Sequence, residues 1–174
     1  MSEEKKKTVN RAVVPSVTIY HPNSRGKGSA LAVRMIPAAL GAVGYVQLEM
    51  ARQRTVGDEK TFPTFNWGER IAVKLSPFET GEVLMCLRGI TESLRDGAGF
   101  MHKGEGTSSK MTLAHMVDHV EGDMVIPRPC YRLQLWRHAE GAEANDCWIY
   151  LTVEEAFTIE TALTGAMPRL CFGR

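Results

Sequence analysis

Basic and aromatic residues are interleaved along several short segments of this chain, a combination that suits single-stranded nucleic acid. Cationic side chains neutralise phosphates, while flat rings stack on unpaired bases at about 1–3 kcal/mol per base. The alternative is that most of the rings fill the core and the charges are solvated. The candidate phosphate contacts are Arg25, Lys27 with the adjoining Gly28 and Ser29, Arg34, Arg52, Lys74 and Lys110. The candidate stacking rings are Tyr20, Tyr45, Phe65, Trp67 and Trp136, and Gln47 is a candidate contact to a base edge or sugar.

The segment R-G-K-G-S, residues 25–29, resembles a fragment of a nucleotide-binding loop. A P-loop has the pattern G-x-x-x-x-G-K-[ST] between a strand and a helix. Here the first glycine is missing at that distance, and the segment lies between two strand-like stretches. We therefore predict a hairpin turn. It is either a flexible connection or a basic turn that lets Lys27 and the backbone approach a phosphodiester.

Catalytic groupings are weak in this sequence. No G-x-S-x-G motif is present, and the five histidines show no recognisable triad spacing. His115 and His119 stand four residues apart with Asp118 between them, but that spacing converges on a metal only on a helix. His115 follows a strand pattern, so the two rings would diverge. We predict no enzyme activity, metal or cofactor, and a metal-dependent hydrolase that uses these three residues is the rival hypothesis.

The composition is that of a folded domain. Of 174 residues, 44% are hydrophobic and 24% charged, which excludes a disordered or collagen-like chain. The net charge is +1, but residues 1–75 hold 12 Lys and Arg against 6 Asp and Glu, whereas residues 76–174 hold 9 against 14. This asymmetry is compatible with one basic face for a polyanion. The four cysteines lack C-x-x-C spacing, which indicates reduced thiols rather than a disulfide framework or a zinc site.

Neither secretion nor membrane insertion is predicted. No run approaches the roughly 18 apolar residues of a transmembrane helix. The N-terminal MSEEKKK lacks the apolar core of a signal peptide and is too acidic for a transit peptide. We expect a cytoplasmic or nucleoid-associated protein, or a nuclear or organellar one if a targeting segment has been removed. Residues 1–15 predict a flexible basic arm ahead of one domain over residues 16–174.

Period-two alternation predicts strands in both parts of this domain. In residues 45–54, for example, Val46, Leu48 and Met50 alternate with polar residues, which is typical of a sheet with one wet face. Residues 55–68 are predicted to form a loop with an aromatic end. The predicted strands are residues 16–21, 29–36, 45–54, 70–75, 100–103, 109–116, 131–138 and 147–151.

Two strand-to-helix junctions carry the same signal. Ser76 and Thr152 are suitable N-caps, and a glutamate follows each of them three residues later, which completes a capping box. Pro168 is expected to end the second helix at Met167, because the residue before a proline disfavours helical geometry. Apolar stripes at helical spacing follow each cap, formed by Val83, Leu84, Leu87 and Ile90 and by Ala156, Ile159, Leu163 and Ala166.

The two junctions lie 76 residues apart, and strands precede each of them. Repetition on this scale predicts an α+β fold built as a tandem ββββα repeat, with halves of about residues 16–98 and 99–174. Two antiparallel four-stranded sheets are expected to pack together with two helices.

Four stretches, spread over roughly residues 16–173, match the motifs of a single known family. Residues 25–33, R-G-K-G-S-A-L-A-V, are similar to the family's K-G-K-A-A-L segment with its middle changed. Residues 67–84, W-G-E-R-I-A-V-K-L-S-P-F-E-T-G-E-V-L, resemble its tryptophan, strand and L-S-P-x-E-x-G helix start. The other two stretches are F-M-H-K with S-K-M-T-L, residues 100–103 and 109–113, and the final helix and tail, residues 154–173. Together the four stretches resemble the Whirly family of single-stranded-DNA-binding proteins.

The resemblance implies a cyclic homotetramer held together by its helices, with single-stranded DNA bound across the sheets and little sequence preference. It implies protection or organisation of single strands in replication, repair, recombination or transcription. A guide-type RNA-binding and annealing protein is an alternative, because that related group shares the S-P-x-E core. An oligomeric protein scaffold that self-associates through residues 76–89 and 152–167 is another. The expected partners are single-stranded DNA, with single-stranded RNA as the alternative, and further copies of the chain.

Overall fold

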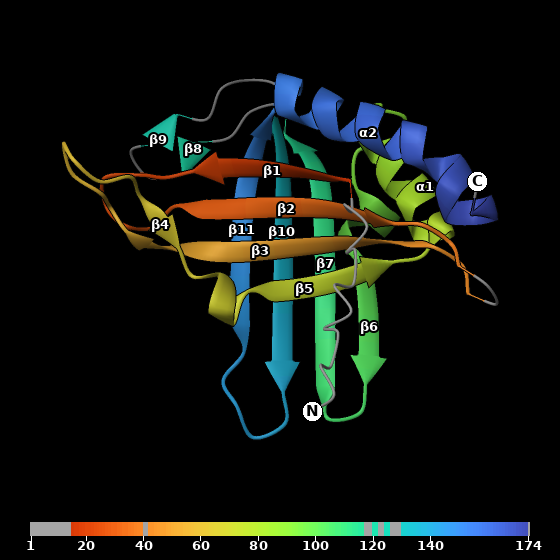
Figure 1. Ribbon diagram of the computed structural model, residues 1–174, viewed down its shortest axis with the longest axis horizontal. Coiled ribbons are helices and arrows are strands. Elements are labelled where there is room, and N and C mark those ends of the chain that lie inside the picture. The colour runs from red at the N-terminus through yellow and green to blue at the C-terminus, as the bar shows by residue number, and fades with distance from the viewer. Residues whose placement is uncertain (1–14, 40–41, 117–119, 122–123, 126–129, 174) are drawn as a thin grey trace, which may run out of the picture.

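Two antiparallel sheets pack face to face, and the strands of one run across those of the other (Figure 1). This computed structural model describes residues 15–39, 42–116, 120–121, 124–125 and 130–173. Sheet 1 contains β1 (Ser16–His21), β2 (Ser29–Ile36), β3 (Tyr45–Thr55), β4 (Thr64–Phe65) and β5 (Ile71–Leu75). Sheet 2 contains β6 (Phe100–Gly104), β7 (Thr107–Met116), β10 (Cys130–Ala139) and β11 (Asn145–Thr152).

The helices follow the last long strand of each sheet. They are α1 (Pro77–Leu87) and α2 (Val153–Phe172), which lie side by side next to the packed sheets (Figure 1). The short elements are η1 (Trp67–Glu69), η2 (Leu94–Gly97) and the paired strands β8 (Val120–Glu121) and β9 (Met124–Val125). This order confirms the predicted α+β fold with its tandem ββββα plan.

Sheet 1 has one more strand than expected. β4 lies inside residues 55–68, which were predicted to be a loop, and it pairs with the far end of β3 across a register shift between Gln53 and Thr55. A two-residue strand carries no periodic signal, so alternation along the sequence could not reveal it. The predicted arm, residues 1–15, lies outside the described residues apart from Pro15.

The core fills the space between the sheets, because the apolar phase of each strand faces the opposite sheet. The buried cluster includes Leu31 and Met50 from sheet 1, Leu135 and Ile149 from sheet 2, and Leu163 from α2, each at most 2% exposed. Burial of apolar area of this kind contributes about 25 cal/mol per Å². The outward phases of the two sheets therefore point in opposite directions, and they carry the polar and aromatic residues discussed below.

Both predicted capping boxes are present. The Ser76 hydroxyl accepts from the Glu79 amide at 3.3 Å, and the Glu79 carboxylate accepts from the Ser76 amide at 2.9 Å. Thr152 and Glu155 repeat these two distances at the start of α2. Each box pairs N–H groups that the first helical turn would otherwise leave without partners.

The predicted helix ends need two corrections. Helix α2 continues through Pro168 to Phe172, because tertiary contacts hold its last turn: Leu170 is fully buried, and its carbonyl accepts from the Gly44 amide at 2.9 Å. Helix α1 ends at Leu87, so Ile90 lies beyond the buried stripe and is 64% exposed. In the described part of the chain, no helix is both long and apolar enough to cross a membrane.

Candidate nucleic-acid interface

The segment between β1 and β2 forms a compact basic turn, residues 22–28, as the sequence predicted. The Asn23 side chain accepts hydrogen bonds from the amides of Arg25 and Lys27 at 3.1 and 2.9 Å. The Gly26 amide bonds the Asn23 carbonyl at 3.2 Å, and its φ of +68° is the left-handed conformation that glycine adopts without strain. Lys27 is exposed while Gly28 is buried, so the lysine is open to solvent although the residue next to it is packed against the protein.

The basic turn adjoins β11, which is one of the two edge strands of sheet 2. The Ser29 hydroxyl donates to the Trp148 carbonyl at 2.6 Å, which ties β2 to that edge. The resulting groove has a volume of about 350 Å³. Its lining residues are Gly26, Lys27, Gly28, Ser29, Arg52, Gln53, Cys147 and Trp148. We refer to it as the junction groove, since it lies where the ends of β1, β2 and β3 extend past β11 (Figure 1).

Trp148 is a ring that the sequence analysis missed. It is 39% exposed and stands in the junction groove with Lys27. Its signal was present in the sequence, because Cys147, Ile149 and Leu151 occupy the buried phase of β11 and place Trp148 on the outward phase.

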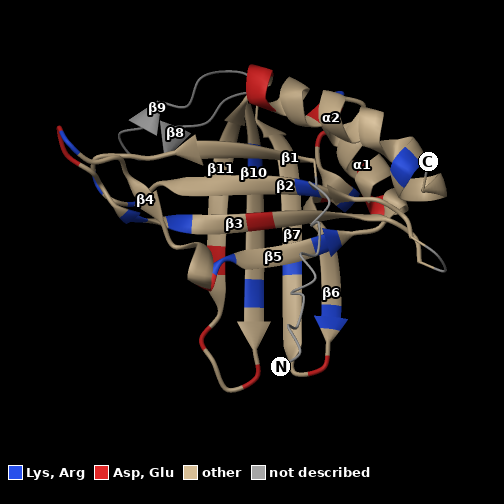
Figure 2. Ribbon diagram, in the orientation of Figure 1, with Lys and Arg blue, Asp and Glu red and all other residues tan. Residues whose placement is uncertain are grey.

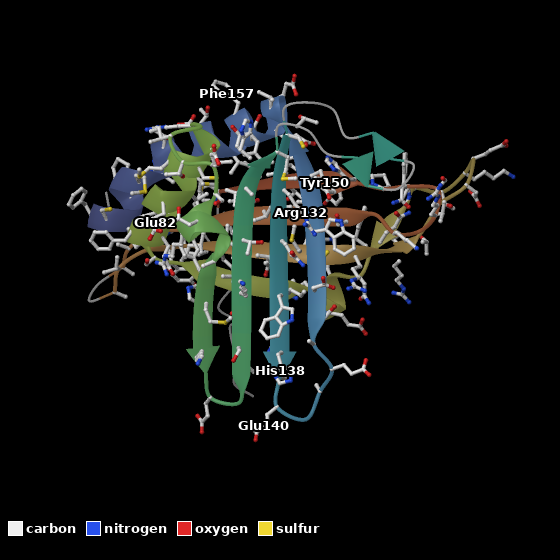
Figure 3. All side chains as sticks on the ribbon, turned by 180° about the vertical axis from the view of Figure 1, so that it is seen from behind. Glu82, Arg132, His138, Glu140, Tyr150 and Phe157 are labelled. Carbon is white, nitrogen blue, oxygen red and sulfur yellow. The ribbon has the colours of Figure 1, made fainter. Side chains whose placement is uncertain are left out.

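The outward face of sheet 2 continues from the junction groove. Trp148 stands opposite Gln134, and the next row across the sheet joins Trp136 to Lys110 and Lys110 to Met101. A second hollow of about 260 Å³ lies here, lined by Met101, Lys110, Thr112, Gln134 and Trp136. Figure 3 looks onto this face, with Arg132 and His138 labelled along β10. Trp136 is half-buried and stacks on His138, with ring centroids 6.0 Å apart and planes 14° apart.

The basic residues on and beside the outward face of sheet 2 differ in whether they are paired with acidic residues. Lys27 and Lys110 form no ion pair with any described residue, whereas Arg52 pairs with Asp146 at 2.8 Å. Gln134 also donates to Asp146, at 3.1 Å, so the acidic side chain in this row is already occupied by protein partners. Figure 2 shows basic positions on β6, β7 and β10 and acidic ones at the turns that join the sheet 2 strands. Lys110 on the sheet 2 face and Lys27 in the adjoining junction groove are therefore available cations.

The outward face of sheet 1 holds other candidates, but its charges are paired. Glu49 is only 3% exposed and accepts from Arg34 Nε at 2.9 Å, Arg70 Nε at 2.7 Å and Gln47 Nε2 at 2.8 Å. Burial alone would raise the pKa of the Glu49 carboxyl, but these three hydrogen bonds outweigh burial and hold the pKa below its usual value. Arg34 and Gln47 thus serve the Glu49 network instead of projecting freely.

The rings of the sheet 1 face also have partners. Lys74 Nζ lies 4.9 Å from the centroid of the Tyr45 ring, a cation–π contact. Tyr20 and Phe65 meet with centroids 5.4 Å apart, although β2 and β3 separate their strands. Both rings must therefore lean over β2 and β3, which explains why Ala30 is fully buried on an outward phase. Trp67 is half-buried in η1, and it is its backbone carbonyl, not its ring, that accepts from Arg70 Nη1 at 2.9 Å.

The structure therefore brings together only part of the candidate set. Lys27, Gly28, Ser29 and Arg52 line the junction groove, and Lys110 and Trp136 line the hollow on sheet 2. Tyr20, Arg34, Tyr45, Gln47, Phe65 and Lys74 belong to the opposite, sheet 1 side. One extended strand crossing a single face cannot contact both sets on the same protomer.

Of the three residues considered for metal-dependent hydrolysis, the structure describes only His115. The His115 ring packs on Tyr131 at 4.9 Å, while Asp118 and His119 lie outside the described residues. Among the residues that the structure describes, no group of three metal-ligating side chains comes together. All four cysteines are free thiols, and burial raises the pKa of both Cys86 and Cys147 to about 11, so these two are protonated at neutral pH.

The fold is that of the Whirly proteins. The structure of WHY1 from Arabidopsis thaliana matches with a TM-score of 0.67 and 17% sequence identity, over 93% of this chain and 88% of that chain. The structure of WHY3 from Arabidopsis thaliana matches with a TM-score of 0.62 and 18% identity, over 90% and 88% of the two chains. No family model matches the sequence, and no curated protein matches it. The resemblance predicted from sequence is thus confirmed at the level of the fold.

Proposed function

We propose that this protein is a non-enzymatic binder of single-stranded nucleic acid, with DNA preferred to RNA. One observation carries the proposal: two cations without acidic partners among the described residues, Lys27 and Lys110, each line a hollow with an indole ring, Trp148 and Trp136 respectively. Such pairs provide a phosphate contact and a stacking platform side by side. The preference for DNA rests on the fold likeness and on the sequence resemblance.

The binding track runs from the junction groove onto the outward face of sheet 2. Trp136 and Trp148 lie on neighbouring strands and are diagonal to each other, because Gln134 faces Trp148 and Asp146 faces Trp136. Diagonal positions of this kind stand about 7–8 Å apart, so two bases can be held in succession. The sheet 1 candidates form a second, weaker hypothesis, since Arg34 and Lys74 already have partners on that face.

Little sequence preference is expected along this track. Rings accept any base, and the amide best placed to recognise a base edge, Gln134, already donates to Asp146 at 3.1 Å. A role in protecting or organising single strands during replication, repair, recombination or transcription fits such binding. A cytoplasmic or nucleoid-associated location is part of the same proposal.

Self-association through the helices is the second part of the proposal. Large apolar side chains project from both helices: Phe78 is 88% exposed, Phe157 68% and Met85 43%. We propose that these side chains belong to one protein–protein contact surface on the paired helices, since contiguous exposed apolar patches mark such contacts. The occupant that the sequence resemblance favours is further copies of this chain, up to a tetramer.

The direct test is fluorescence anisotropy with an oligo-dT strand, an oligo-U strand of equal length and a matched duplex, combined with light scattering. We expect tightest binding to oligo-dT, and a log–log salt dependence with a slope of about −0.7 per neutralised phosphate. Equal affinity for duplex and single strand would reject the proposal. A metal-dependent hydrolase would instead degrade the probe in the presence of a divalent cation, and a pure scaffold would assemble without binding any of the three probes.

A further inference from the structure

A buried amide lies directly beneath the basic turn. Gln53 comes from the far end of β3 and is only 8% exposed, one of the few buried polar side chains in the described residues. A glutamine is rarely enclosed unless its amide finds partners, because an unpaired buried polar group is costly. The hydrogen-bond partners of Gln53 therefore indicate which segment its amide stabilises.

The Gln53 amide is fully occupied by backbone. Its oxygen accepts from the Asn23 and Gly28 amides at 2.9 and 3.0 Å. Its nitrogen donates to the Asn23 and Thr55 carbonyls at 3.1 and 3.0 Å. A primary amide offers two acceptor and two donor sites, so every site is used. Three of these bonds go to the first and last parts of the basic turn.

The contact between Gln53 and the turn is too close for a side chain at position 28. A Cβ added to Gly28 would lie 2.4 Å from Gln53 Oε1 and 2.2 Å from the His21 carbonyl. Glycine is therefore needed here for close approach of the backbone to the amide, rather than for flexibility. Lys27, the neighbouring cation, is carried by a backbone clamped immediately beside it.

We propose that Gln53 is a positioning residue for nucleic-acid binding: it reaches no phosphate itself but holds the basic turn in the one orientation that aims Lys27 into the junction groove. This inference rests on the proposed function. A clamped turn loses less conformational freedom when a strand binds, so its contacts contribute more to affinity. Without the Gln53 hydrogen bonds, Lys27 keeps its charge, but its backbone is no longer held in the orientation that points it into the junction groove.

The test uses Gln53→Met, which preserves side-chain length and removes all four hydrogen bonds. We expect oligo-dT affinity to fall about tenfold, a loss comparable to that of one charge-assisted contact. The salt slope should become shallower by about 0.7. In a Lys27→Ala background the same substitution should cause little further loss, because interacting residues are not additive. Asn23→Ala changes an exposed residue and removes the two side-chain hydrogen bonds to the Arg25 and Lys27 amides, so it should reproduce these effects if Gln53→Met folds poorly.

Ile159→Val is the matched control for stability, since it removes one buried methyl group from α2 and Ile159 does not line the junction groove. It should lower the melting temperature and leave oligo-dT affinity unchanged. Affinity losses for Gln53→Met and Lys27→Ala that simply add in the double variant would overturn the inference. So would an unchanged salt slope.

Hydrogen exchange of residues 22–28 in the free protein separates this inference from the proposed function. Gln53→Met should remove the protection of the Asn23 and Gly28 amides, whose acceptor is the Gln53 oxygen. Unchanged protection would refute the proposal that Gln53 holds the basic turn, whatever the protein binds. If instead the wild-type chain binds no oligo-dT, the proposed function fails, while exchange still reports whether Gln53 anchors the turn.

Discussion

His102 Nε2 lies 2.7 Å from Glu79 Oε1, so a strand of sheet 2 holds the capping glutamate of α1. The other helix shows the reciprocal arrangement, because His21 Nε2, at the end of β1, lies 2.7 Å from Glu155 Oε1 at the start of α2. The first strand of each half therefore supports the helix of the other half. Each helix start is thus held by a side chain from the opposite sheet, which links the two halves.

This arrangement predicts a defined dependence of stability on pH. Burial alone would raise the pKa of the Glu79 carboxyl, but hydrogen bonds from His102 and Ser76 outweigh burial and hold the pKa below 4.5. The unfolded chain therefore binds this proton more readily, and the stabilisation is present above about pH 4.5 and is lost as pH falls through the lower folded pKa. Urea denaturation should show Glu79→Gln less stable than wild type at about pH 6, with the gap closing at about pH 3. A gap that stays constant would contradict this assignment.

Substitutions on the two opposite faces should have different effects on binding. Trp136→Ala and Lys110→Ala, on the sheet 2 face, should weaken oligo-dT binding, by about 1–3 kcal/mol for the ring. Tyr45→Ala and Lys74→Ala remove a similar ring and cation from the sheet 1 face and should have smaller effects. Anisotropy titrations of the four variants check this, with thermal melts to confirm folding. The reverse ranking would move the binding track to sheet 1.

Removal of the Glu49 charge should destabilise the protein and increase the positive charge of the sheet 1 face. Glu49→Gln leaves the Arg34 and Arg70 guanidinium groups without their carboxylate. We expect a loss of about 1–3 kcal/mol in the free energy of unfolding, since both arginines are partly solvated. Chemical denaturation at neutral pH measures it. If oligo-dT binding also tightens markedly, the sheet 1 face takes part in binding.

Assembly should depend on the exposed helix face. Phe157→Asp places a charge where a 68% exposed ring now projects from α2, so oligomers should dissociate to smaller species in light scattering. Phe62→Asp is the matched control, because Phe62 is 91% exposed but lies in the connection between β3 and β4. If both variants assemble like wild type, the helices are not the contact surface.

Pro168 should limit the stability of α2. A proline inside a helix removes one backbone hydrogen bond and crowds the preceding turn, at a cost of about 3 kcal/mol. Pro168→Ala should therefore raise the free energy of unfolding, by up to about 3 kcal/mol, as measured by urea denaturation. A decrease would show that the proline geometry is required for the contacts of Leu170 with the β2–β3 connection.

Local signals in the sequence predicted most of the fold. The alternation around Met50 and the capping boxes at Ser76 and Thr152 are properties of short segments, and the structure confirms each of them. Such local signals could not predict β4 or the end of α2. The pairing of Phe65 opposite Gln53 and the burial of Leu170 depend on segments distant in the chain.

For the interface, the sequence by itself determined the alternating phases of the long strands and which turn carries Lys27. Only the tertiary structure decided which cations and rings remain available. Arg34 is neutralised by a carboxylate 15 residues away, while Lys27 meets Trp148 from the other sheet in one groove. The physical reason is that alternation places a side chain on a face through local geometry, whereas its partners depend on sheet register and on how two sheets cross.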